Sequence, residues 1–159
     1  MSVNVKGLNE AIKALRQKGV KAERAIVGVL EDVASNIEQD AKNAAPIELF
    51  PGGIDVRTLK GLIDKVVSNK GLNWEIGVQA NMDLIENHVY AYAEFGTGLD
   101  AGQILSQAGY TDEIRSLART FKKNGKGTLK GKPYLFPAYI RRTANLVDEM
   151  KKEVADALK

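Results

Sequence analysis

The segment LNWEIGVQ, residues 72 to 79, decides the fold, because its apolar residues alternate strictly with polar residues and one Gly. The apolar residues that share one face of the expected strand are Leu72, Trp74, Ile76 and Val78. The preceding segment LIDKVVSN, residues 62 to 69, reaches this strand through a short Lys-Gly turn. Alternation of period two with a short turn predicts an antiparallel hairpin that buries one face.

Amphipathic helices are expected before and after this hairpin. Residues 19 to 45 carry apolar residues three and four apart, and Pro46 ends the pattern. This first stripe consists of Ile26, Leu30, Val33, Ile37, Ala41 and Ala44. After Pro137, which suits a first helical turn, a second stripe consists of Ile140, Val147, Met150, Val154 and Leu158. The pattern predicts an α+β fold, in which a small antiparallel sheet packs against a long helix of the N-terminal half and a C-terminal helix.

Shorter elements are expected elsewhere in a single domain that spans residues 1 to 159. A strand is predicted at residues 2 to 6 and a helix at residues 8 to 16. YAYAEF, residues 90 to 95, alternates like a strand, but Tyr90 and Glu94 are also four apart, which favours a short helix stopped by Gly96. Residues 98 to 132 are expected to form a long loop with one short helix. Thr111 would cap that helix, which carries Ile114, Leu117, Ala118 and Phe121.

Composition excludes several classes of site. The 159 residues include no cysteine and one histidine, His88, so disulfides, thiolate catalysis and the usual metal clusters are excluded. No apolar run approaches the ~20 residues that cross a bilayer, and the first ten residues lack a basic and then apolar signal region. We expect a protein made in the cytoplasm that binds no membrane, metal or cofactor.

Motifs that indicate catalysis or phosphate binding are incomplete. GTGLDAG at residues 96 to 102 is one residue away from a dinucleotide fingerprint, and GTLKGKP at 127 to 133 lacks the spacing of a phosphate loop. His88 has acidic neighbours, but a lone histidine beside an acid is more often incidental than a general base. A Ser/Lys dyad, for example Ser68 with Lys70, stays open, although nothing selects it. We expect that the protein is not an enzyme.

The charge is unevenly distributed along the chain. Segment 115 to 132 carries seven cations and no acid: Arg115, Arg119, Lys122, Lys123, Lys126, Lys130 and Lys132. Since the whole chain carries +3 and this basic segment +7, the remainder carries −4. The basic segment could be a solvated loop, an arm that docks on an acidic neighbouring protein, or a surface that contacts DNA.

Two aromatic stretches carry a resemblance to a known family. YAYAEFGT at residues 90 to 97, then PYLFPAY at 133 to 139 and an amphipathic C-terminal helix, resemble the tail-component family of long-tailed, siphovirus-type bacteriophages, which are neck or tail-completion proteins. The residues that match the family's pattern are Tyr90, Ala91, Glu94, Phe95, Gly96, Thr97, Pro133, Tyr134, Leu135, Pro137 and Ala138. A long helix that ends in Ala45-Pro46 also matches. The sequence departs from the family at Arg57, where a Gly is usual, and in the length of the loop from 98 to 132.

The resemblance implies a structural virion protein of the phage neck. Copies would form a homo-oligomeric ring that joins or completes the tail at the head-tail interface. Partners would be the chain itself, head-completion proteins, and tail-terminator or tail-tube proteins, with a passing contact to DNA in the channel. The basic segment would dock on neighbouring protein, and the alternative function is DNA binding through residues 115 to 132.

The implied subunit or partner interface lies on the two aromatic stretches. It comprises Tyr90, Tyr92, Glu94, Phe95, Gly96, Thr97, Pro133, Tyr134, Phe136, Pro137 and Tyr139. Tyrosines suit both interfaces and cores, because each hydroxyl needs a partner or water. Core packing is expected for Phe95 and for one of Tyr134 and Phe136. We expect Glu94→Lys to impair assembly and to leave the monomer folded.

Overall fold

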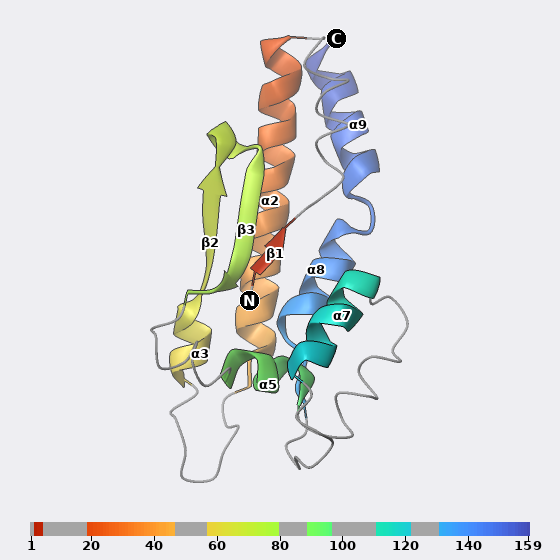
Figure 1. Ribbon diagram of the computed structural model, residues 1–159. Helices are drawn as coiled ribbons and strands as arrows, with labels where there is room; N and C mark the ends of the chain where they lie inside the picture. The colour runs from red at the N-terminus through yellow and green to blue at the C-terminus, as the bar shows by residue number, and fades with distance from the viewer. Residues whose placement is uncertain (1, 5–18, 47–56, 80–88, 97–110, 122–130) are drawn as a thin grey trace.

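The computed structural model (Figure 1) describes residues 2–4, 19–46, 57–79, 89–96, 111–121 and 131–159. In chain order its elements are β1 (Ser2–Asn4), α2 (Val20–Ala44), α3 (Arg57–Leu62), β2 (Ile63–Ser68), the 3-10 turn η2 (Asn69–Gly71), β3 (Asn73–Val78), α5 (Val89–Phe95), α7 (Asp112–Phe121), α8 (Leu135–Thr143) and α9 (Leu146–Ala157). The expected helix at residues 8 to 16 lies outside this described part of the chain.

The elements form layers around α2. The sheet has the order β1-β3-β2 with both pairings antiparallel, and its register places Ile63 opposite Val78 and Val67 opposite Trp74. In Figure 1, α2 lies between this sheet and the two C-terminal helices, and it contacts β2, β3, α8 and α9. The predicted α+β fold and its hairpin are therefore confirmed.

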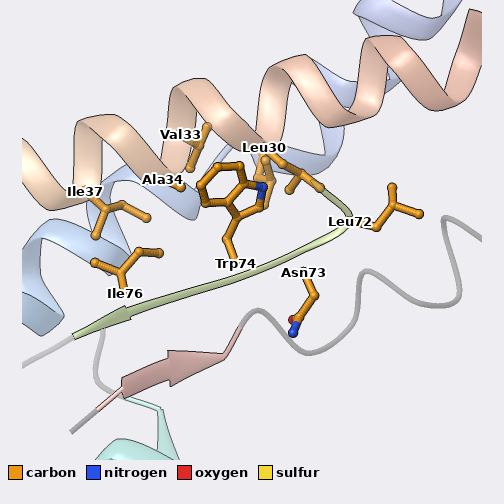
Figure 2. Close-up of a pocket in the computed structure, with 9 residues that line it drawn as sticks. Leu30, Val33, Ala34, Ile37, Leu72, Asn73, Trp74 and Ile76 are labelled. Atoms are coloured by element: carbon orange, nitrogen blue, oxygen red, sulfur yellow. The ribbon is translucent and has the colours of Figure 1, made fainter. Parts of the chain in front are cut away.

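The core between α2 and β3 is built around Trp74. Figure 2 shows the indole beneath α2, close to Leu30, Val33 and Ala34. Its Nε1–H donates to the Gly71 carbonyl at 2.8 Å, so the one polar atom of this buried ring has a partner. The crevice beside the ring encloses about 10 Å³, which is about what one water needs. We interpret it as a packing defect of the core, not as a ligand pocket.

The β2–β3 turn depends on Gly71. Asn69 and Lys70 have φ of 50° and 56°, and Gly71 follows with φ of 89°. A Cβ on Gly71 would lie 2.7 Å from Cγ1 of Val27 on α2. Val is restricted at χ1, so it has little freedom to turn away. The turn thus fixes how the hairpin docks on α2.

Gly71→Ala is expected to lower the free energy of unfolding by about 1 to 3 kcal/mol, through the positive φ and the clash with Val27. Urea denaturation measures this loss. Gly28→Ala is the matched control, because a Cβ on this exposed helical residue meets nothing within 4 Å. It is expected to stabilise the protein by up to about 1 kcal/mol. Equal stabilities of the two variants would contradict the role of Gly71.

The C-terminal helix differs from the prediction, because it is broken in two. α8 ends at Thr143, whose Oγ1–H donates to the Tyr139 carbonyl at 2.9 Å, an arrangement that often bends helices. α9 begins at Leu146, and the break changes which residues face α2. Leu146, Met150 and Val154 are buried in α9, whereas Val147 and Leu158 are 51% and 41% exposed. The predicted single stripe through Val147 and Leu158 was therefore wrong.

Three shorter predicted features agree with the structure, whereas the last residue of the α2 stripe does not. The strand near the N-terminus is confirmed for Ser2–Asn4, and the helix at YAYAEF is confirmed as α5, with Gly96 following at φ of 72°. The N–H of Ile114 donates to Oγ1 of Thr111 at 3.4 Å, as expected of a cap on α7. At the end of α2, however, Ala44 is exposed and Ala45 is buried, so the predicted stripe was wrong at its last residue.

Candidate functional site

The two aromatic stretches meet where α5 lies against the start of α8. The Lys132 N–H donates to the Ala93 carbonyl at 2.8 Å, and the Tyr134 hydroxyl donates to the Tyr90 carbonyl at 3.4 Å. The rings of Phe95 and Phe136 stack with centroids 5.5 Å apart. Residues about forty positions apart in sequence therefore form one packed cluster.

Glu94 lies at the centre of this cluster and is fully buried. Its Oε2 accepts the N–H groups of Tyr134 and Leu135, both at 2.8 Å, and its Oε1 accepts the Phe136 N–H at 3.1 Å. One carboxylate thus binds three consecutive backbone donors at the start of α8. We call this arrangement the Glu94 clamp.

The sequence around α8 explains why the Glu94 clamp is needed. The first four N–H groups of a helix have no partner within the helix. Tyr134 occupies the N-cap position and makes no capping hydrogen bond with its side chain. Pro137, the third helical residue, has no N–H, so three donors remain, and Glu94 accepts all three. The positive end of the helix dipole also favours a carboxylate here.

Burial changes the acidity of Glu94. Desolvation raises the pKa of its carboxyl from 4.5 to about 7, because a buried charge loses its contact with water. The N–H groups of Leu135, Tyr134 and Phe136 oppose this rise, since they bind the ionised form better. Desolvation also raises the pKa of the buried Tyr134 hydroxyl. The carboxyl of Glu94 therefore titrates near neutral pH.

The residues predicted to form an interface divide into two groups by burial. Tyr90, Glu94, Phe95, Gly96, Tyr134 and Phe136 are buried within the chain. Tyr92, Pro133, Pro137 and Tyr139 are partly exposed, and Thr97 lies outside the described residues. Glu94→Lys would put an ammonium group against three backbone donors, so our expectation of an undisturbed monomer does not fit this burial. Tyr134 and Phe136 are both core residues, whereas the sequence led us to expect only one of them in the core.

Few residues of the basic segment can be placed. Arg115 pairs with Asp112 at 3.7 Å, and its side chain is 36% exposed. Lys132 has an exposed side chain, and its backbone joins the cluster through Ala93. Arg119 lies in α7, but its side chain is not described. Lys122, Lys123, Lys126 and Lys130 lie outside the described residues.

An ion-pair group that sequence analysis missed joins α2 to α8. Asp40 Oδ2 accepts Arg142 Nε–H and an N–H of Arg141 Nη2, both at 2.7 Å. Hydrogen bonds from Arg142 and then Arg141 lower the pKa of Asp40 to about 2. The adjacent arginines are visible in the sequence, but their partner is about a hundred residues away. No local pattern could have identified it.

Metal-binding groups, membrane-spanning helices and grooves are the remaining features to consider among the described residues. They contain no group of three or more side chains suited to a metal ion, and no helix among them is long and apolar enough to cross a bilayer. A groove of about 500 Å³ between α2 and α9 is lined by charges of both signs, including Arg24, Asp32, Glu149, Lys152 and Glu153. This mixture does not select a ligand class. The Glu94 carboxylate is occupied by backbone donors.

Comparison with known proteins gives no match. No family model fits the chain, and no curated protein and no solved structure is significantly similar to it. Functional inference therefore rests on the sequence motifs and on the geometry of the cluster around the Glu94 clamp.

Proposed function

We propose that this chain is a structural virion protein of the neck of a long-tailed, siphovirus-type bacteriophage. Copies form a homo-oligomeric ring that joins or completes the tail at the head-tail interface. The observation that carries the proposal is the Glu94 clamp. It joins the two sequence stretches on which the resemblance rests, although about forty residues separate them.

The cluster suits a scaffold whose surface must be presented at a fixed angle. Its buried members, including Phe95 stacked on Phe136, hold α5 against the start of α8. Tyr92, Pro133, Pro137 and Tyr139 keep part of their surface exposed around this core. A ring needs two different complementary patches on each subunit. We assign one of these patches to the partly exposed residues.

Electron microscopy of the purified full-length chain tests the proposal. We expect closed rings of one size, and we expect Tyr139→Arg to reduce the fraction of ring because it places a charge in the subunit contact. Lys152→Ala on α9 is the control, since this exposed residue lies outside the cluster. Circular dichroism verifies that both variants fold.

A different result would support DNA binding, the alternative function, instead of ring formation. A chain that stays monomeric at all concentrations, and binds duplex DNA with an affinity that falls steeply with salt, would be a DNA-binding protein. In that case charge-removing changes in the basic segment would weaken DNA binding, and Tyr139→Arg would have no effect on assembly.

A further inference from the structure

Within the described part of the chain, the outer edge of β2 is open. Among the strands that the structure describes, β2 pairs only with β3, because the strand order is β1-β3-β2. Unpaired N–H and C=O groups on a strand edge are a template to which another chain can add a strand. The opposite edge belongs to β1, which has three residues where β2 has six. β2 therefore offers the longer edge for pairing.

The register shows which residues of β2 face that edge. Gln79 N–H donates to the Leu62 carbonyl at 2.7 Å, in the pair that extends the β2–β3 register by one position. Hydrogen-bonded and non-hydrogen-bonded pairs alternate along antiparallel strands. The even-numbered residues of β2 therefore direct their backbone groups toward β3. Ile63, Lys65 and Val67 direct theirs toward the open edge.

The side chains near the edge favour pairing. Val66 and Val67 are 47% and 50% exposed, and they lie on opposite faces of the strand. Exposed β-branched residues on an unpaired edge promote association between copies of a chain. A second β2 strand would cover both valines and satisfy the outward backbone groups. If β2 is to stay unpaired, a residue on this edge must prevent a second strand from binding there.

Asp64 is the residue of β2 that can prevent a second strand from pairing with the open edge. Its carboxylate Oδ1 accepts the N–H of Lys65 at 2.8 Å, and both groups are exposed. The Lys65 N–H is the central one of the three donors on the open edge, so an incoming strand would have to place a carbonyl oxygen where the carboxylate lies. Pairing would break a charge-assisted hydrogen bond and bring two acceptors together.

We propose that Asp64 prevents a second copy of this chain from pairing with the open edge of β2. The Lys65 donor, occupied by the Asp64 side-chain oxygen, keeps β2 unpaired despite its exposed valines. The inference does not depend on the ring, because a ring through the cluster around the Glu94 clamp leaves this edge unused. Failure of one proposal therefore leaves the other intact.

The test compares Asp64→Ala with Asp64→Asn in the full-length chain. Ala removes both the charge and the acceptor, whereas Asn keeps an oxygen that can accept the Lys65 N–H. Sedimentation velocity over a series of concentrations measures association beyond the species that the wild type forms. We expect Asp64→Ala to strengthen self-association by about tenfold or more over the wild type. We expect Asp64→Asn to change it little.

A third variant tests whether the increased association occurs through the open edge of β2. Val67→Pro removes an outward N–H without removing a donor to β3, so adding it to Asp64→Ala is expected to restore wild-type behaviour. Circular dichroism checks that all variants fold. The proposal is overturned if Asp64→Ala associates no more than the wild type. It is also overturned if Asp64→Asn associates as strongly as Asp64→Ala, or if Val67→Pro does not reverse the effect.

Discussion

Replacing Glu94 is expected to cost more stability than any other single change proposed above. Glu94→Ala leaves three buried N–H donors of α8 without a partner and opens a cavity, so we expect a loss of about 3 to 5 kcal/mol in the free energy of unfolding. Glu94→Gln keeps the size of the side chain, but one oxygen becomes an NH₂ group that faces backbone donors. We expect it to lose about 1 to 3 kcal/mol.

Urea denaturation of the wild type and the two variants at pH 4.5 measures these losses. Glu31→Gln is the control, because it makes the same chemical change on the exposed face of α2, where we expect less than about 0.5 kcal/mol. Hydrogen exchange locates the effect, which should be largest at the amides of Tyr134, Leu135 and Phe136. Glu94→Gln with wild-type stability at pH 4.5, where the gap is expected to be largest, would show that the Glu94 clamp contributes nothing.

The elements that local periodicity specifies could be predicted from the sequence. Trp74 and its alternating neighbours define β3, and the stripe from Ile26 to Ala41 defines α2, because each pattern repeats with the period of its element. The break between α8 and α9 could not be predicted. The two residues at the break, Ala144 and Asn145, are neither Pro nor Gly, so no helix-breaking residue marks it. By pattern alone, Leu146 and Val147 fit the buried stripe of a helix equally well. Packing of α9 against α2 buries Leu146 and leaves Val147 exposed.

The Glu94 clamp could be predicted only in part. The sequence identified both aromatic stretches, but it suggested that an acid beside aromatics is an exposed contact. The overlooked signal is the missing cap on α8: PYLFP offers no Ser, Thr, Asp or Asn to accept the donors of a helix that starts there. A helix without a local cap needs an acceptor from elsewhere. Which acid supplies it depends on tertiary structure, which no single sequence pattern reports.

The buried carboxyl of Glu94 also predicts how stability depends on pH. Its pKa is about 7 in the folded chain, against 4.5 as its ordinary value. Between these pH values the folded chain holds a proton that the unfolded chain has released, so stability falls as pH rises. At about 1.4 kcal/mol per pKa unit, the loss from this one group is on the order of 3 kcal/mol. The contribution is fully present below about pH 4.5 and is lost as pH rises through about 7.

Asp40 acts in the opposite direction at lower pH. Arg142 and Arg141 hold its pKa at about 2, below its ordinary value of 3.8, so its contribution is present above about pH 3.8 and is lost as pH falls toward 2. Asp40→Asn should remove part of the acid-side loss and leave the change between pH 4.5 and 7 unaltered. The two carboxyl groups therefore affect separate pH ranges, which lets each be measured without the other.

Denaturation of the wild type and Glu94→Gln at a series of pH values from 4 to 8 isolates the contribution of Glu94. The chain's histidine and its other acids are present in both proteins, so the difference between the two curves removes their titration. We expect Glu94→Gln to be least stable relative to the wild type near pH 4.5, and the gap to narrow as pH rises through 7. A gap that widens over this range would mean that the three backbone donors outweigh desolvation and hold Glu94 ionised in the folded chain.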